Sequence, residues 1–434
     1  MGMTKCRKLY EGFVAAATAH ARWDYETSMS ILKSRKKLFI LGLMILPVVL
    51  VSMAFAVDLP AILGGKKAYS PAFYNSTIFI ISIFIGLCAG LITGCIGAGG
   101  GFIITPALMS AGVKGILAVG TDLFHIFAKA IMGSAVHKKL GNISVGLAVA
   151  FLAGSFIGVT GGGVINRTLY EMNPVLSDTF ISLIYVVMLG FLGSYALFDF
   201  LKLKKKGGKA DAHGGNPGSG NPGGGNPAAV AGVTGFAGRL QATQIPPVIT
   251  FDQDLVPGGR RLPAVFVAVC GGIVGFVAAI MGVGGGFLTF PMFVYTLGVS
   301  SFTTVGTDIF QIIFTAGWAS ISQYAVYGFI FYTLAMGMLL GSLIGIQVGA
   351  LTTKVVKGIY IRGFYATAIL AGFVNRLFAL PGKLADLEVI KISKGLGAGL
   401  TMAGTIFFFV VIGFFAAWVC SKFFGNIKTL KGEV

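Results

Sequence analysis

Charged residues are scarce in this chain of 434 residues. Asp, Glu, Lys and Arg together make up 11% of it, against roughly 25% in an ordinary soluble domain. Hydrophobic residues make up 55%, which excludes a water-soluble globule. Repeated apolar runs have the length that spans a bilayer, about 20 residues, and indicate an all-α polytopic membrane protein.

The sequence also lacks the motifs of disulfide-stabilised, metal-binding and nucleotide-binding proteins. The five cysteines have no C-x-x-C spacing and the four histidines are scattered, so we expect no disulfide framework, no metal site and no catalytic residues. The first glycine cluster lacks the Gly-Lys-Ser/Thr ending of a phosphate-binding loop, and no cofactor is expected. The net charge of +18 comes from Lys and Arg between apolar runs, so membrane orientation explains it better than nucleic-acid binding does.

The apolar runs predict ten full-length spans and two half-length ones. The full runs cover 38–57, 77–97, 115–137, 143–163, 179–200, 263–283, 304–326, 329–350, 358–376 and 399–421. The short runs, 102–113 and 287–299, begin directly after glycine clusters. We interpret them as the half-helices of two broken helices.

The composition divides the chain into six segments. We expect a cytoplasmic amphipathic N-terminal segment (1–37), an extra transmembrane span (38–57), a first transmembrane repeat (77–200), a flexible cytoplasmic linker (201–262), a second transmembrane repeat (263–380), and a loop, last span and cytoplasmic tail (381–434). The part of the linker from 214 to 227 is rich in Gly, Asn and Pro and cannot bury a core. The structure of 228–261 stays open.

Three blocks of sequence recur in the same order. The matched pairs are Gly97–Pro106 with Gly282–Pro291 at an offset of 185, Val119–Phe124 with Val305–Phe310 at 186, and Gly154–Gly158 with Gly341–Gly345 at 187. Matched blocks in fixed order indicate an internal duplication.

The distribution of basic residues predicts how the two repeats are oriented. If each half-helix counts as one crossing, 23 basic residues lie inside and 8 outside, whereas half-helices that turn back would give 15 and 16. The positive-inside rule favours the first arrangement, in which both termini are cytoplasmic and the repeats are inverted. The outer residues in this count are Lys66, Lys67, Lys114, Arg167, Arg376, Lys383, Lys391 and Lys394.

The motif Gly-x-Gly-Gly-Gly-Phe with a following Pro occurs twice, each time succeeded by Gly-Thr-Asp. This pattern resembles the sulfite exporter TauE/SafE family, over roughly residues 77 to 376. The resemblance implies a permease for small sulfur-containing or carboxylated anions such as sulfite, sulfonates or thiosulfate, without a known cofactor. The partners expected are therefore a small anionic substrate and the lipid bilayer of the inner (plasma) membrane.

Several questions of function stay open at this point. No ATP-binding motif accompanies the spans, so transport should be secondary or passive. The alternatives are a channel or a membrane anchor or sensor whose linker binds a soluble partner, and a membrane-embedded enzyme. Coupling to protons and assembly as a homodimer are left open.

The two glycine clusters are candidate parts of a substrate site. Glycines let backbone approach a ligand closely, and the unpaired N–H groups at a helix N-terminus attract anions. The alternative is tight helix packing through small residues. The candidate residues are Gly97, Gly99, Gly100, Gly101, Gly282, Gly284, Gly285 and Gly286.

Ionisable residues inside one span form the second candidate group. Asp122, His125 and Lys129 are spaced i, i+3 and i+7, which places them on one helical face, where Lys129 could supply charge and His125 could move a proton. They could equally satisfy one another. The matching face of the second repeat has Asp308, Gln311 and Thr315, so both candidate cations are lost there.

Hydroxyl and aromatic residues near these faces complete the candidates. Thr121 and Thr307 precede the aspartates and could bind either a ligand or helix backbone. Trp318, Tyr324 and Tyr327 fit either a cavity wall or an interfacial aromatic belt, and the belt is favoured.

Overall fold

The computed structural model describes residues 76–96, 100–139, 143–205, 236–243, 245–252, 258–352, 355–356 and 358–426. The predictions for the N-terminal segment and the first span lie outside the described residues. So do those for the Gly-Asn-Pro part of the linker and for Gly97 and Gly99.

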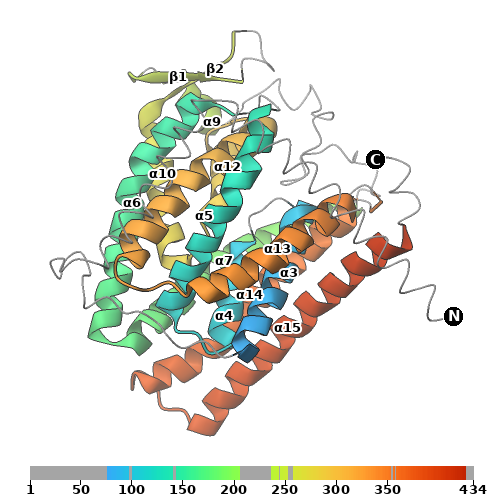
Figure 1. Cartoon of the computed structure of the whole chain (residues 1–434). Coiled ribbons are helices and arrows are strands. Elements are labelled where there is room, and N and C mark those ends of the chain that lie inside the picture. Colours follow the sequence, from blue (N-terminus) through green and yellow to red (C-terminus); the bar gives the residue numbers. More distant parts are fainter. Residues whose placement is uncertain are drawn as a thin grey trace.

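The described chain is mostly helical (Figure 1). Its helices are α3 (Ser76–Ile96), α4 (Gly101–Ser110), α5 (Gly115–Lys139), α6 (Val145–Met172), α7 (Pro174–Lys205), α9 (Phe236–Ala242), α10 (Ala264–Met281), α11 (Gly286–Pro291), α12 (Ser301–Trp318), α13 (Tyr332–Thr352), α14 (Gly358–Asp386) and α15 (Lys394–Gly425). Two of them continue as π-helices, α11 into η3 (Met292–Thr296) and α12 into η4 (Ala319–Ala325).

Seven of these helices are long and apolar enough to cross a membrane, namely α3, α6, α7, α10, α13, α14 and α15. The chain is therefore a multi-pass membrane protein. Helices α5 and α12, which carry the candidate polar residues, form at the predicted positions but are not among the seven.

Both short apolar helices begin at a glycine with left-handed backbone. Gly100 precedes α4 with φ of 69°, and Gly285 precedes α11 with φ of 88°. Side chains strongly disfavour this conformation, so glycine is what allows the chain to turn into each short helix. The segments predicted as half-helices are present as α4 and as the continuous α11–η3.

The two halves of the chain interleave. Helix α3 of the first half packs along α13 of the second, α6 packs along α10, and α7 along α14. Helices α5 and α12 pack against each other, while α15 lies along the outside against α14 (Figure 1). Each half thus contributes one helix to each of these four pairs, α3–α13, α6–α10, α7–α14 and α5–α12.

Glycines form the seams of the α3–α13 and α6–α10 pairs. A Cβ on Gly158 would overlap the backbone of Gly272, and a Cβ on Gly345 would overlap the carbonyl of Leu87. Lipid tails are as apolar as the side chains of these helices, so moving such side chains from lipid into a helix interface gains little free energy. Close backbone contact through small residues therefore drives helix association in a membrane. The seam glycines recur at four-residue spacing: Gly154, Gly158 and Gly162 on α6, and Gly341, Gly345 and Gly349 on α13.

The end of the linker is folded against helices of both halves. After α9, strands β1 (Val248–Phe251) and β2 (Arg260–Pro263) form an antiparallel hairpin. Phe251 and Leu262 are buried in a cluster with side chains of α6, α10 and η3. The sequence had left this segment open.

Two arginines counted above in the outer loops lie inside helices instead. Arg167 belongs to α6 and Arg376 to α14, and they are 8% and 2% exposed. The two residues are helical because both helices extend beyond the apolar runs seen in the sequence, and on which side of the membrane they lie stays a prediction.

Candidate functional site

The starts of the two short helices lie in contact. A Cβ on Gly101, the first residue of α4, would lie 2.9 Å from the Cα of Val283 in the second glycine cluster. From that cluster, Gly284 packs against the side chain of Ile126 on α5. The structure therefore brings together the two glycine clusters, which are 185 residues apart in the sequence.

A buried carboxylate lies at each of these helix starts. Oδ2 of Asp122 lies 3.4 Å from the position of a Cβ on Gly101, and Oδ2 of Asp308 lies 3.1 Å from that on Gly286. The hydroxyl of Thr105 on α4 donates to Asp122 Oδ2 over 3.0 Å. Negative charge at a helix N-terminus is favourable, so each aspartate balances the positive end of a short helix.

We call the glycine interruption before α4 the first break and that before α11 the second break. The ammonium of Lys129 lies at the first break, and the corresponding position at the second break is Thr315. Its Nζ donates to Thr93 Oγ1 on α3 over 3.3 Å. The same hydroxyl oxygen lies 2.7 Å from the position of a Cβ on Gly100. Lys129 thus places a positive charge beside the glycine that starts α4.

His125 connects α5 to α13. Its Nε2 is 2.9 Å from Ser342 Oγ, and its Nδ1 faces Asp122 Oδ1 at 3.8 Å, beyond hydrogen-bond distance. Both residues are fully buried, and neither Asp122 Oδ1 nor His125 Nδ1 has a hydrogen-bond partner among the described residues. The first half therefore leaves two buried polar atoms unsatisfied.

The corresponding residues of the second half form a closed chain of hydrogen bonds. Gln311 Nε2 donates to Asp308 Oδ1 over 2.9 Å, and Thr315 Oγ1 donates to Gln311 Oε1 over 2.6 Å. Thr315 is also 3.1 Å from Ser155 Oγ on α6. The two aspartates thus have matching positions but different surroundings.

Thr121 and Thr307 bind helix backbone in this structure. Thr121 Oγ1 donates to the carbonyl of Leu117 over 2.6 Å and accepts the N–H of Phe331 over 3.0 Å. Thr307 Oγ1 accepts the N–H of Ser144 over 3.0 Å. Phe331 and Ser144 immediately precede α13 and α6, so each threonine holds the start of a helix from the other half.

Comparison with known proteins identifies the family. A family model described as "Sulfite exporter TauE/SafE" matches residues 82–376, which include all of these contacts. The chain belongs to the sulfite exporter TauE/SafE family. Two relatives from Bacillus subtilis (strain 168) are the "Probable membrane transporter protein YjnA" and the "Probable membrane transporter protein YunE".

The similarity to these relatives is low and differs in extent. The match to YjnA is 23% identical over 276 residues, which is 62% of this chain and 87% of the relative. The match to YunE is 31% identical over 97 residues, 22% of this chain and 36% of the relative. No solved structure matches. The family and these names indicate a membrane transporter, with a small-molecule substrate and membrane lipid as its partners, rather than an enzyme.

Within the TauE/SafE region, buried side chains also hold the ends of the broken helices. Arg376 donates from its NH2 group to Ser110 Oγ over 2.7 Å and to the carbonyl of Pro106 over 3.3 Å, at the C-terminal end of α4. A cation is favourable there. The sequence alone does not reveal this role, because Arg376 and α4 are far apart in the sequence and come into contact only in the folded protein.

Two tyrosines hold the last turn of α10. Tyr185 donates to the carbonyl of Met281 and Tyr324 to that of Ala279, each over 2.5 Å. Both rings are fully buried. The expectation that Tyr324 belongs to an interfacial belt was wrong, because its hydroxyl satisfies a carbonyl that the interruption of α10 leaves free.

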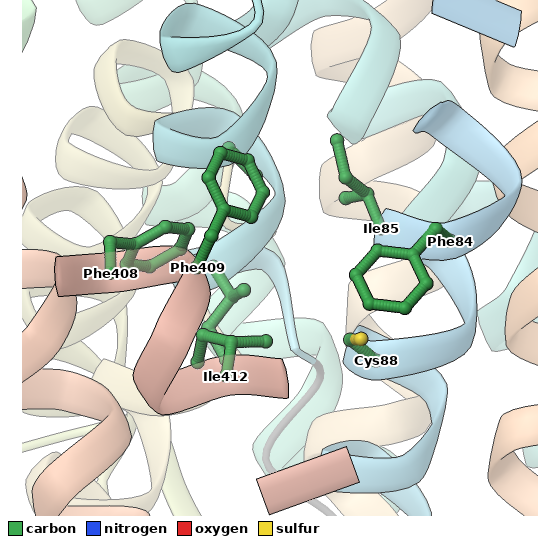
Figure 2. A pocket seen from close by; sticks show the side chains of 8 residues that line it. Phe84, Ile85, Cys88, Phe408, Phe409 and Ile412 are labelled. Atoms are coloured by element: carbon green, nitrogen blue, oxygen red, sulfur yellow. The ribbon is translucent and has the colours of Figure 1, made fainter. Parts of the chain in front are cut away.

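An apolar pocket lies apart from the candidate site, between α3, α4 and α15 (Figure 2). Phe408, Phe409 and Ile412 of α15 face Ile85 and Cys88 of α3 across it. Its other lining residues, Phe84, Ile103 and Ala107, are also apolar. The pocket offers no group that would bind an anion, and α15 lies beyond the family match.

Proposed function

We propose that this TauE/SafE protein is a secondary or passive transporter of a small anion in the inner (plasma) membrane. Sulfite, an organosulfonate or a related sulfur-containing anion is the proposed substrate class. The family description supports the substrate, and the relatives' names support transport. The observation that carries the anion site is the position of Lys129, whose ammonium lies beside Gly100 at the start of α4.

The balance of charge favours an anion at the first break. The N-terminus of a helix carries roughly half a positive charge, and Lys129 adds a full one, while Asp122 contributes one negative charge. The first break is therefore slightly positive. The second break has a helix end and Asp308 without the corresponding lysine, so it is slightly negative.

The proposed site contains the residues of the first break at its centre. Lys129 and the N–H groups around Gly100 and Gly101 bind the anion, and Asp122 and His125 set the charge of the site. Gly97 and Gly99, predicted for the same site, lie outside the described residues. The second cluster, with Gly282, Gly284, Gly285 and Gly286, covers the site, and Asp308 and Gln311 brace it. Thr121 and Thr307 act through the helix starts that they hold.

Transport through this site requires the two breaks to separate. In the present structure Gly101 packs directly on Val283, so the path is closed between them. The proposed motion is a rocking of inverted repeats about their shared seams, the arrangement used by many secondary transporters. The reciprocal pairing of α3 with α13 and of α6 with α10 supports it.

Counterflow into proteoliposomes tests the function directly. We expect internal unlabelled anion to drive uptake of radiolabelled sulfite, thiosulfate or sulfoacetate, with sulfate and acetate as comparison substrates. Absence of counterflow for every anion would refute transport of this class. Product formation without gradient-dependent uptake would indicate an enzyme.

Replacement of Lys129 tests the site. Lys129→Met keeps the apolar stem and removes the charge, so we expect affinity to fall about tenfold or more, the worth of a charge-assisted hydrogen bond. Lys129→Arg should retain part of the affinity, whereas Lys391→Met, in an exposed loop, should retain all of it. Unchanged affinity in Lys129→Met would leave only helix ends to hold the anion.

A further inference from the structure

Two buried polar atoms of the first break face each other, and neither has a hydrogen-bond partner in the part of the chain that the structure describes. Oδ1 of Asp122 and Nδ1 of His125 are 3.8 Å apart, and both residues are completely buried. The other atoms of the two groups are occupied, Asp122 Oδ2 by Thr105 and His125 Nε2 by Ser342. Leaving a buried polar atom unsatisfied costs about 1–3 kcal/mol, so such a pair calls for a ligand.

The hydrogen bonds around His125 define what is missing. Ser342 donates its hydroxyl hydrogen to the carbonyl of Leu339 over 3.2 Å. Nε2 of His125 must then be the donor to Ser342, which leaves Nδ1 of the neutral ring as an acceptor. A lone pair of Nδ1 thus faces a lone pair of the Asp122 carboxylate. One hydrogen between them would satisfy both atoms.

We propose that Asp122 and His125 form a proton-binding site, so that one proton is carried with each anion. This inference rests on the proposed anion transport and adds its coupling ion. On binding, the proton forms a covalent bond to Nδ1 or to Oδ1 and a hydrogen bond to the other atom. On release that N–H or O–H bond breaks and the proton leaves to water. The two atoms must approach from 3.8 Å to about 2.7–2.9 Å when the proton is bound.

The second half contains the corresponding contact, between Asp308 and Gln311, without a place for an added proton. Gln311 occupies the position of His125, and its amide donates to Asp308 over 2.9 Å. An amide has a fixed hydrogen, so this contact is satisfied without any proton from outside. The duplicated chain therefore contains an open version and a closed version of the same contact.

The charges around the pair connect proton binding to anion binding. Lys129 lies on the same helix and its charge opposes the added proton, whereas an anion beside Lys129 offsets that charge. By reciprocity, a bound proton increases anion affinity as much as a bound anion increases proton affinity. The titratable or charged residues on the elements packed against α5 include Asp178 and Tyr185 of α7, Asp308 of α12, Tyr324 of η4, Tyr332 of α13, Arg167, Tyr170 and Glu171 of α6, and Cys270 of α10.

Four of those groups, Tyr185, Tyr324, Asp308 and Asp178, are held by their own hydrogen-bond partners. Tyr185 and Tyr324 donate to carbonyls of α10, and Asp308 accepts from Gln311. Asp178 accepts the N–H of Gly115 at the far end of α5. Helix α4 contributes no titratable residue. The Asp122–His125 pair is thus where a proton gains most among these described groups.

The experiment uses the variant His125→Gln, which gives the first half the residue found at the corresponding position of the second half, Gln311. Uptake of radiolabelled sulfite is measured in proteoliposomes with an imposed pH gradient and the membrane potential clamped by K⁺ and valinomycin. For one proton per anion, wild-type accumulation should change about tenfold per pH unit at equilibrium. His125→Gln should lose accumulation driven by the pH gradient, and its counterflow, which needs no net driving force, is measured in parallel to show that the variant still exchanges the anion. His213→Gln, in the linker, is the matched control and should behave as wild type.

The possible outcomes distinguish failure of the proton site from failure of the transport function. If wild type shows counterflow but no accumulation in a pH gradient, the proton site is refuted and the transport function stands. Accumulation that persists in His125→Gln would also refute it, whereas loss of counterflow in wild type would refute transport itself. Should His125→Gln lose counterflow or fail to elute as a monodisperse protein, Ser342→Ala replaces it. That variant removes the Nε2 partner, frees the other tautomer, and should shift the pH dependence of uptake; an unchanged pH profile would refute the site.

Discussion

The glycine seams permit a prediction whose size follows from the structure. In Gly158→Ala, the new Cβ would lie 2.8 Å from the carbonyl carbon of Gly272 and 2.8 Å from the backbone nitrogen of Phe276. All of these contacts are backbone, so no rotamer change can relieve them and α6 and α10 must separate. A gap of about 0.5–1 Å already loses a quarter to a half of the dispersion energy of each contact. Overpacking of this kind typically costs about 1–3 kcal/mol.

A matched substitution isolates the seam from the general effect of replacing glycine in a helix. Alanine is favoured over glycine in a helix by about 1 kcal/mol, which partly masks the overpacking. Gly413→Ala on α15 has the same gain, and a Cβ there would meet nothing within 4 Å. The difference in the free energy of unfolding between the two variants should therefore be the seam cost, about 1–3 kcal/mol.

The measurement is the unfolding temperature of each purified variant in detergent, read from the soluble fraction after heating. Gly158→Ala should unfold several degrees below Gly413→Ala. Gly345→Ala, which meets Leu87 and Leu91 across the other seam, should match Gly158→Ala. Equal unfolding temperatures for Gly158→Ala and Gly413→Ala would refute the argument that backbone contact holds the helix pairs together.

Two further predictions concern topology and asymmetry. A cysteine placed at Ser219 should resist membrane-impermeant thiol reagents in intact cells, because the basic residues put the linker inside; external labelling would contradict the inverted arrangement. Asp308→Asn should reduce sulfite counterflow less than Asp122→Asn, because Asp308 already has its amide partner and the matching face of its helix carries no lysine. Equal defects in the two variants would indicate symmetric structural roles for both aspartates.

The local parts of this architecture could be predicted from the sequence, since they depend on neighbouring residues. The half-helices followed from glycine clusters before short apolar runs, and the shared face of Asp122, His125 and Lys129 followed from helical spacing. The four-residue spacing of glycines on α6 and α13 was also readable and would have predicted the seams. These features need only the period of a helix.

The long-range parts could not be predicted in the same way. The hairpin of β1 and β2 has strands of four residues, too short for a periodic signal, and it is held by contacts such as that of Asp252 with Ser300 on the second half. Arg376 reaches Pro106 across 270 residues of sequence. Thr121 could have bound ligand or backbone, and only the position of Phe331 decides between them in this structure.

The two short helices are fixed at their far ends, which indicates where movement can occur. Arg376 of α14 holds the C-terminal end of α4, and Arg260 of β2 donates to the carbonyl of Gly298 over 2.7 Å, just beyond η3. Gln241 of α9 adds a bond of 2.8 Å to the carbonyl of Leu297. Each short helix should therefore move together with the element that carries its arginine, so displacement is concentrated at the glycine breaks. For α11–η3 that element is the folded end of the linker, which gives the linker a direct mechanical connection to the second break.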